Sequence, residues 1–159
     1  MDEPLVLARE ALTYYLKTGR YLKLPADSKL LKQKAAGVFI CLKKEGRLRG
    51  CMGTVQGTKP SLAEEIVYNT VLAATADPRF PPVSFNELDK IELAVDILAA
   101  PEPAAATELN PKVYGVIVTN GQKSGLLLPD LEGVNTIAEQ LKIAKLKAGL
   151  KEGESYQLY

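Results

Sequence analysis

Two hairpin signals constrain the fold of this chain more than any other feature of its sequence. In the first, the β-rich run 38–42 is followed by turn-forming residues 43–46 and a candidate return strand over 47–51. In the second, Asn120-Gly121 follows strand-like residues 113–119 and favours a tight hairpin turn. Hairpins join neighbouring antiparallel strands, so the chain is predicted to form antiparallel sheet.

Helices are predicted on both sides of these hairpins. Apolar residues recur at helical spacing over 5–18, and a second helix, with Ser61 as its N-cap, is expected to end near residue 76. A half-buried strand is predicted at 90–98 and a last helix at 136–149. Hairpins and helices that follow one another without strict alternation indicate an α+β fold, an antiparallel sheet of hairpins flanked by helices.

The length of the chain favours a single domain. Its 159 residues match the usual size of one domain, so residues 1–159 are expected to form one core, with or without an attached lobe. The stretch 99–111 is rich in proline and alanine. We interpret it as a surface loop and not as a domain boundary, because too little chain follows it for a second core.

The net charge bears on whether the chain binds nucleic acid. The formal net charge is +1, whereas a dedicated DNA-binding domain normally carries a clear positive excess. Nucleic acid is not excluded, because net charge does not describe local patches. The last predicted helix carries Lys142, Lys145, Lys147 and Lys151, for which a solvated face is the favoured interpretation.

The compartment is predicted to be the cytoplasm, without membrane association. No apolar run approaches the ~20 residues that cross a bilayer, and the first residues lack the basic and apolar parts of a signal peptide. The two cysteines lie on one predicted hairpin, where Cys51 is expected to face residue 38 or 39. Cys41 would then lie two or three strand positions away, so no intrachain disulfide is predicted.

Histidine is absent from the chain. Its absence removes Cys-His and Ser-His-Asp catalysis within the chain and most zinc and iron sites. Two cysteines are also too few for an iron–sulfur cluster. We therefore expect no metal and no cofactor.

The segment Leu48-Arg49-Gly50-Cys51-Met52-Gly53 is the main candidate for chemistry. Arg49 offers a cation that would favour the Cys51 thiolate, and Gly50 and Gly53 would let a ligand approach backbone amides. The alternative is structural: the glycines form a β-bulge, and Cys51 is a small buried apolar residue.

Two further features are candidates for the same site. The segment Asp77-Pro78-Arg79-Phe80-Pro81-Pro82 is stiffened by three prolines and would present Arg79 rigidly to a carboxylate or phosphate. The alternative is that Arg79 is paired to a nearby carboxylate. Asn69 falls on the apolar face of the second helix, where its amide either braces a loop or faces a ligand.

With these segments in view, the chain resembles the AMMECR domain family, whose prokaryotic members are called AmmeMemoRadiSam system protein A. The resemblance rests on the two segments above and on Gly125-Leu126-Leu127-Leu128-Pro129 and Lys147-Ala148-Gly149-Leu150. It implies two unequal subdomains with the hexapeptide lining a cleft between them, and association with Memo-type and radical-SAM proteins. The activity of the family is unsettled, with suggestions that range from a modifying enzyme to a module that binds nucleotides, nucleic acids or peptides.

The resemblance places the candidate site on six residues: Arg49, Gly50, Cys51, Gly53, Asp77 and Arg79. The chain departs from the family pattern at Tyr114-Gly115, where a His-Gly pair is common, and at Asp130, where glutamine is common.

Two hypotheses of function follow. In the favoured one, the cleft around 48–53 and 77–82 binds an anionic small molecule, nucleotide or partner peptide, with Asn69 among the binding residues. In the alternative, the protein is a modifying enzyme in which Cys51 is the nucleophile, with Arg49 and Asp77 as further catalytic residues. Without histidine, the enzyme would need Asp77, a tyrosine, water or a partner residue as its proton acceptor.

Overall fold

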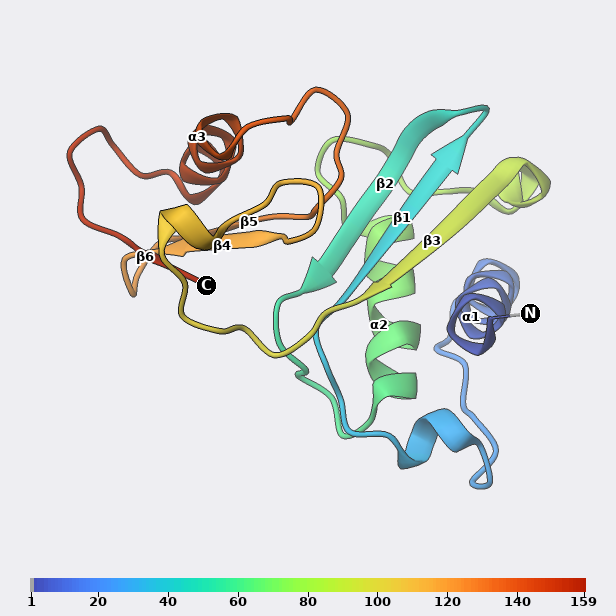
Figure 1. Cartoon of the computed structure of the whole chain (residues 1–159). Helices are drawn as coiled ribbons and strands as arrows, with labels where there is room; N and C mark the ends of the chain where they lie inside the picture. The colour runs from blue at the N-terminus through green and yellow to red at the C-terminus, as the bar shows by residue number, and fades with distance from the viewer. Residues whose placement is uncertain (1) are drawn as a thin grey trace. The chain divides into compact units, whose positions relative to one another are not determined.

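The computed structural model describes residues 2–159 and divides the chain into two compact units (Figure 1). Unit 1 comprises residues 1–100, unit 2 comprises residues 101–159, and each has its own apolar core. The predicted α+β class and the two unequal parts are confirmed. Residues 99–111 form a mostly exposed loop, as predicted, but the residues after this loop bury a core of their own, which was not expected.

Unit 1 contains a three-stranded antiparallel sheet and two α-helices. The sheet has the order β2-β1-β3. Its elements along the chain are α1 (Glu3–Thr18), β1 (Val38–Lys44), β2 (Arg47–Thr54), α2 (Leu62–Thr75) and β3 (Ile91–Ile97), with 3-10 turns at Lys29–Lys32 and Phe85–Lys90.

The helix ends follow the predicted signals. Gly19 ends α1 with a φ of 69°, the left-handed conformation that glycine adopts without strain. The hydroxyl of Ser61 accepts a hydrogen bond from the backbone N–H of Glu64 and so caps the first turn of α2. These local signals explain why both helices lie within a few residues of their predicted bounds.

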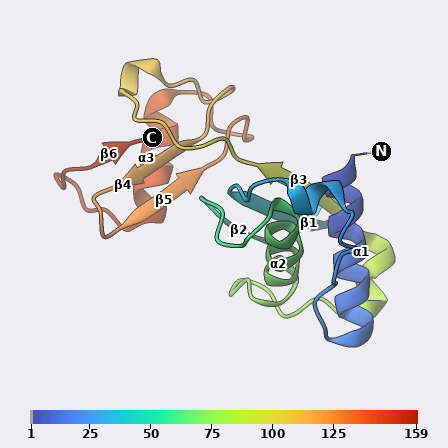
Figure 2. The same ribbon diagram turned by 90° about the horizontal axis from the view of Figure 1, so that it is seen from below.

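Both helices of unit 1 cover one face of its sheet (Figure 2). Val38, Ile40 and Leu42 alternate along β1 and are fully buried against α2 and α1. Ile66 of α2 is equally buried. The alternate side chains of β1 and the apolar side chains on one face of α2 therefore pack in one core. This packing holds α2 against β1 and β2.

The turn of the β1–β2 hairpin is shorter than predicted. Lys44 pairs with Arg47, so that only Glu45 and Gly46 form the turn. Both residues have positive φ, 52° and 77° respectively. This combination is typical of a two-residue type I′ turn, which matches the twist of the flanking strands.

A β-bulge shifts the register of the same hairpin by one residue. Leu42 pairs with Gly50 and Lys43 pairs with Leu48, so that Arg49 has no partner on β1. A bulge bends its strand and redirects the side chain of the extra residue. A bulge is one of the two alternatives that the sequence of this segment allows, and in the structure the bulged residue is Arg49.

Unit 2 is smaller and contains α3 (Ile137–Ala148) and a sheet of three short strands in the order β5-β4-β6. The strands are β4 (Val116–Thr119), β5 (Ser124–Leu127) and β6 (Gln157–Leu158), with a 3-10 turn at Ala106–Glu108. A capping box of Thr136 and Glu139 begins α3, and Gly149 ends it with positive φ. The predicted second hairpin is confirmed as β4–β5.

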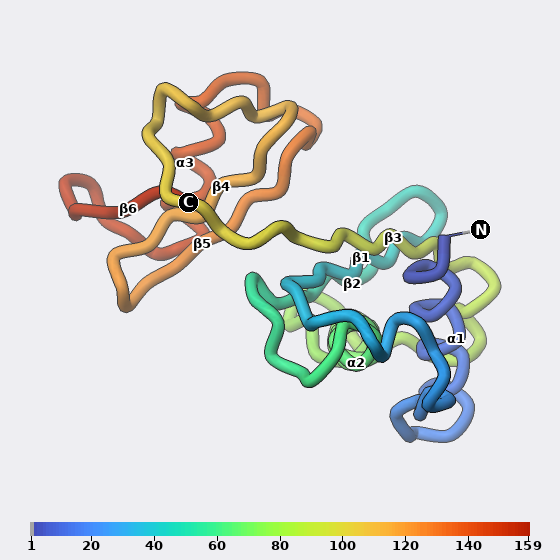
Figure 3. Tube along the Cα trace, turned by 60° about the horizontal axis from the view of Figure 1, so that its bottom comes forward, coloured from blue at the N-terminus to red at the C-terminus, as the bar shows by residue number. Residues whose placement is uncertain are grey.

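The Cα trace passes from unit 1 into unit 2 after β3 (Figure 3). Among the described residues, no helix is long and apolar enough to cross a membrane.

Candidate functional site

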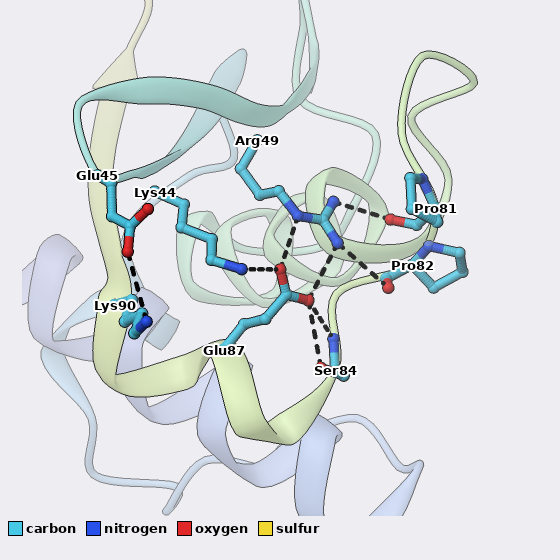
Figure 4. A network of polar contacts seen from close by, with 8 residues as sticks. All are labelled: Lys44, Glu45, Arg49, Pro81, Pro82, Ser84, Glu87 and Lys90. Carbon is cyan, nitrogen blue, oxygen red and sulfur yellow. Dashed lines mark hydrogen bonds and ion pairs between the residues drawn. The ribbon is translucent and has the colours of Figure 1, made fainter.

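Arg49, the bulged residue of β2, is held by a carboxylate far away in the sequence (Figure 4). Its Nε donates to Oε1 of Glu87 at 3.0 Å, and its Nη2 donates to Oε2 at 3.1 Å. This fork of two parallel hydrogen bonds is the strongest geometry for an arginine and a carboxylate. The bulge directs Arg49 toward Glu87, which no local pattern in the sequence predicts.

The remaining donors of Arg49 bind the proline-rich loop. Nη1 donates to the carbonyl of Pro81 at 2.8 Å, and Nη2 donates to the carbonyl of Pro82 at 3.3 Å. The side chain is only 13% exposed. Four of the five N–H donors of Arg49, predicted as a ligand-binding residue, are therefore used within unit 1. Its side chain connects β2 to the loop.

Glu87 is the centre of this network, which we call the Glu87 cluster: Glu87, Arg49, Lys44 and Ser84. Besides Arg49, Glu87 accepts from Lys44 Nζ at 2.9 Å and from the backbone N–H of Ser84 at 2.9 Å. The hydrogen bonds from Arg49, followed by those from Ser84 and Lys44, hold the pKa of Glu87 well below its usual range. The carboxylate is therefore ionised at neutral pH.

Asp77 connects the second predicted segment to the hexapeptide. Its Oδ2 accepts from the backbone N–H of Cys51 at 3.0 Å, at the outer edge of β2. Arg79 donates to the same carboxylate from Nε at 3.0 Å, from Nη2 at 2.7 Å and from its backbone N–H at 3.0 Å. The structure thus brings Cys51, Asp77 and Arg79 together, as the sequence analysis expected of one site.

The two partners of this pair differ in exposure. The Asp77 side chain is 3% exposed, whereas that of Arg79 is 55% exposed. The side-chain hydrogen bonds from Arg79 are the largest cause that holds the pKa of Asp77 well below its usual range. Asp77 is therefore an ionised anchor, and Arg79 is a guanidinium fixed on one side and open to solvent on the other.

Gly50 and Gly53 are required by packing within unit 1. A Cβ atom at Gly50 would lie 2.2 Å from the carbonyl oxygen of Ala73 in α2. One at Gly53 would lie 2.3 Å from the carbonyl oxygen of Val38 in β1. Both glycines let backbone approach backbone, which supports the structural alternative for these two positions.

Asn69 and Glu65 form a buried polar brace beneath β2. Asn69 is fully buried, and its Nδ2 donates to Val38 O at 3.2 Å and to Thr54 Oγ1 at 3.1 Å. Its Oδ1 has no hydrogen-bond partner among the described residues. These contacts match the bracing interpretation of Asn69 and give it no exposed polar atom for a ligand.

Glu65 was missed by the sequence analysis. It is fully buried, and its carboxylate accepts from Thr54 Oγ1 and from the backbone N–H groups of Thr58 and Lys59, each within 2.8 Å. Burial raises the pKa of Glu65, but the hydrogen bonds from Thr54, Thr58 and Lys59 outweigh it and lower the pKa overall. An acidic residue at a core position of α2 was the only signal.

Glu87 was also missed, although the sequence carries a signal for it. Ser84 and Glu87 have the spacing of a capping box, and the structure forms that box at the start of the 3-10 turn Phe85–Lys90. The capping pattern places a carboxylate near Ser84. It does not predict that the same carboxylate binds Arg49 and Lys44 on the neighbouring hairpin.

Cys41 and Cys51 form a disulfide, contrary to the prediction. The two-residue turn and the bulge at Arg49 together move Cys51 to the position directly opposite Cys41, with 4.2 Å between Cα atoms. A disulfide sulfur is not a nucleophilic thiolate, so the Cys51 enzyme hypothesis applies only to the reduced protein.

Reduction of this disulfide is expected to lower the free energy of unfolding by about 2–3 kcal/mol, because the cross-link closes a loop of 10 residues in the unfolded chain. The measurement is urea unfolding with and without dithiothreitol, beside a Cys41→Ser variant that should be insensitive to the reductant. Mass spectrometry after iodoacetamide should find no alkylated cysteine in the untreated protein. Two alkylated cysteines before reduction would contradict the disulfide.

Tyr114, at the position where the resemblance favours histidine, lies in unit 2. Its side chain is exposed, and its carbonyl accepts from Gln140 Nε2 at 2.8 Å. Among the described residues there is also no group of three or more His, Cys, Asp or Glu side chains that could hold a metal ion. Within unit 1, the candidate residues Cys51, Asp77 and Arg79 are in direct contact with one another through the Asp77 carboxylate.

A family model and several known proteins match this chain over most of its length. The AMMECR1 family model matches residues 5–159, a range that includes both units. A protein of Thermotoga maritima is 55% identical over 142 residues, which cover 87% of this chain and 81% of that protein. A protein of Clostridium acetobutylicum is 48% identical over 159 residues.

The chain spans about a third of the Clostridium relative, 34% of its length, although the match covers 99% of this chain. Among solved structures, the crystal structure of the uncharacterized protein PH0010 from Pyrococcus horikoshii superposes with a TM-score of 0.89. That match has 32% sequence identity and covers 98% of this chain and 85% of the other.

Proposed function

The chain belongs to the AMMECR1 family, and on that premise we propose that unit 1 is a binding module that recognises an anionic group through Arg79. The observation that carries the proposal is the asymmetry of the Asp77–Arg79 pair. Asp77 fixes Nε and Nη2 of Arg79 from the buried side, while 55% of the Arg79 side chain is exposed. Nη1 and the second hydrogen of Nη2 remain to bind a carboxylate or phosphate.

Fixing the guanidinium in advance favours binding. A free arginine loses side-chain entropy when it binds, whereas Arg79 is already oriented by two side-chain hydrogen bonds. The centroid of the Phe80 ring lies 5.5 Å from the guanidinium carbon, within the range of a cation–π contact. Exposed lysines and arginines without such partners do not share this advantage.

Binding is better supported than catalysis by the same residues. The Cys51 sulfur is bonded to Cys41, and four of the five Arg49 donors bind Glu87 and the proline-rich loop. The donors around Asp77 hold its pKa far below neutral, which makes its carboxylate a weak proton acceptor. The proposed anion carriers are a nucleotide, another small anion, or an acidic group of a Memo-type or radical-SAM partner.

Replacement of Arg79 tests the proposal. We expect Arg79→Ala to weaken binding of the anion about 10- to 100-fold, the loss of one charge-assisted interaction. Arg79→Lys should recover only part of the affinity, because an ammonium lacks the planar fork. The probes are inorganic phosphate, ATP, and purified Memo-type and radical-SAM proteins, each titrated calorimetrically into the whole chain.

Arg47→Ala is the matched control, because Arg47 is an exposed arginine on the same strand, β2. It should bind the probes as the unchanged protein does. If no probe binds, or if Arg79→Ala and Arg47→Ala weaken binding equally, the proposal is wrong.

A further inference from the structure

β2 is an edge strand with one side unpaired. In the order β2-β1-β3, β2 has β1 on one side and no strand on the other. Figure 1 shows β1 on one side of β2 and no strand of unit 1 on the other. Such an edge presents a row of backbone donors and acceptors to a further strand.

The register identifies which backbone groups face that edge. The Cys51 N–H donates to Asp77 and not to β1, and the Cys41–Cys51 pair has the short Cα separation of a non-hydrogen-bonded antiparallel pair. Pairs alternate along an antiparallel ladder, so the Gly53–Phe39 pair, two residues on, is of the same kind. The N–H and C=O of Gly53 and the C=O of Cys51 therefore point away from β1.

Outside the strand ladder, no backbone hydrogen bond to these three groups occurs among the described residues. Cys51 and Gly53 are partly exposed. Gly53 also has no side chain of its own to shield its amide. Unpaired backbone groups in a row, two of them on a partly exposed glycine, suit the approach of another extended backbone.

Asp77 and Arg79 lie at the Cys51 end of these three unpaired backbone groups. The Asp77 carboxylate already occupies the Cys51 N–H, the donor to which a carbonyl of an added strand would bind. A further strand therefore has to end there. Arg79, which the same carboxylate holds, lies with its free donors next to that end.

We propose that the free edge of β2 binds the C-terminal end of an extended peptide, which pairs with Gly53 and the Cys51 carbonyl and places its terminal carboxylate on Arg79. This inference rests on the proposed anion binding by Arg79 and names the ligand class. The charge of Arg79 complements a chain terminus, and the three unpaired backbone groups give main-chain recognition that a free phosphate or nucleotide would not use.

A main-chain ligand can be tested with peptides of mixed sequence. The probe is an acetylated tetrapeptide library with randomised side chains and free C-terminal carboxylates, added to the ¹⁵N-labelled whole chain and followed by NMR. Two matched libraries carry a C-terminal amide or N-methylated peptide bonds. The Gly53 amide should shift and its hydrogen exchange should slow only with the free-acid library.

Replacement of the peptide's C-terminal carboxylate by an amide should weaken peptide binding about 10- to 100-fold. N-methylation of the peptide bonds should weaken peptide binding about tenfold or more. Arg79→Ala should reproduce the loss caused by the amide, and Arg47→Ala should not.

The peptide inference and the anion proposal fail in different ways. If the N-methylated library binds as well as the free acid, or if the Gly53 amide is unaffected while Arg79 responds, the edge does not pair with peptide. Anion binding by Arg79 then stands. Equal binding of the amide library overturns the terminal carboxylate as the ligand. If neither the libraries nor phosphate, ATP and the protein partners bind, both proposals are wrong.

Discussion

Glu87→Ala is expected to lower the free energy of unfolding of unit 1 by about 3 kcal/mol or more. The substitution removes the carboxylate from Arg49, which is 13% exposed, and from Lys44. Two cations would then share a partly buried space without a counter-charge, and the N–H of Ser84 would lose its acceptor. Urea unfolding followed by circular dichroism measures the loss.

Glu45→Ala is the matched control for Glu87→Ala. Glu45 pairs with Lys90 at 3.4 Å, but the side chains are 68% and 60% exposed, and such surface pairs contribute about 0–1 kcal/mol. Figure 4 shows this pair beside the Glu87 cluster. Equal losses for the two variants would contradict a structural role for the cluster.

The Glu87 cluster also predicts a direction of pH dependence. Because its pKa is depressed in the folded state, Glu87 binds protons more readily in the unfolded chain. Its stabilising contribution is present above the unfolded pKa of about 4.3 and is lost as pH falls through that value toward the folded pKa. The two pH values to compare are pH 6 and pH 3, which lie about two units above and about one unit below that pKa. Between them, the free energy of unfolding of the Glu87→Gln variant should fall less than that of the unchanged protein.

Glu65→Ala is expected to have an effect of similar size, about 3 kcal/mol or more. It leaves the backbone N–H groups of Thr58 and Lys59 without their acceptor and removes a partner of Thr54. Each unpaired buried donor costs about 1–3 kcal/mol. The loop before α2 should also exchange its amide hydrogens faster, which hydrogen-exchange mass spectrometry detects.

Glu65→Gln and Glu64→Ala separate the causes. The glutamine keeps one oxygen for the Thr58 and Lys59 donors, so its loss should lie between those of the alanine variant and the unchanged protein. Glu64 is the exposed neighbour, whose backbone N–H binds the Ser61 cap, and its alanine variant should lose less than about 1 kcal/mol. A loss for Glu64→Ala as large as that for Glu65→Ala would contradict the buried brace.

Local signals in the sequence predicted most of the secondary structure. Gly19 and Gly149 end helices where expected, and Ser61 and Thr136 begin them. These predictions succeed because a cap depends on residues within one turn of the helix. The α+β class follows from the same signals, since it needs only the order of helices and hairpins.

The candidate site could be predicted only in part. The sequence left open whether Arg79 is presented to a ligand or paired to a nearby carboxylate, and the structure pairs it with Asp77. Asp77 also accepts from the backbone N–H of Cys51, so the two predicted segments meet there. The pairing of Arg49 with Glu87, 38 residues away, was not expected. Arginines are long, and a sequence does not say which of several carboxylates each will meet.

Tertiary structure alone decided the register of the first hairpin and the state of its cysteines. A two-residue turn and one bulged residue bring Cys51 opposite Cys41, and each step of register reverses which side chains face the core. Burial of Val38, Ile40 and Leu42 against α2 selects that register. The sequence by itself therefore determined the elements and their order, whereas packing between distant elements determined which groups meet, because contact energies depend on neighbours that local patterns do not specify.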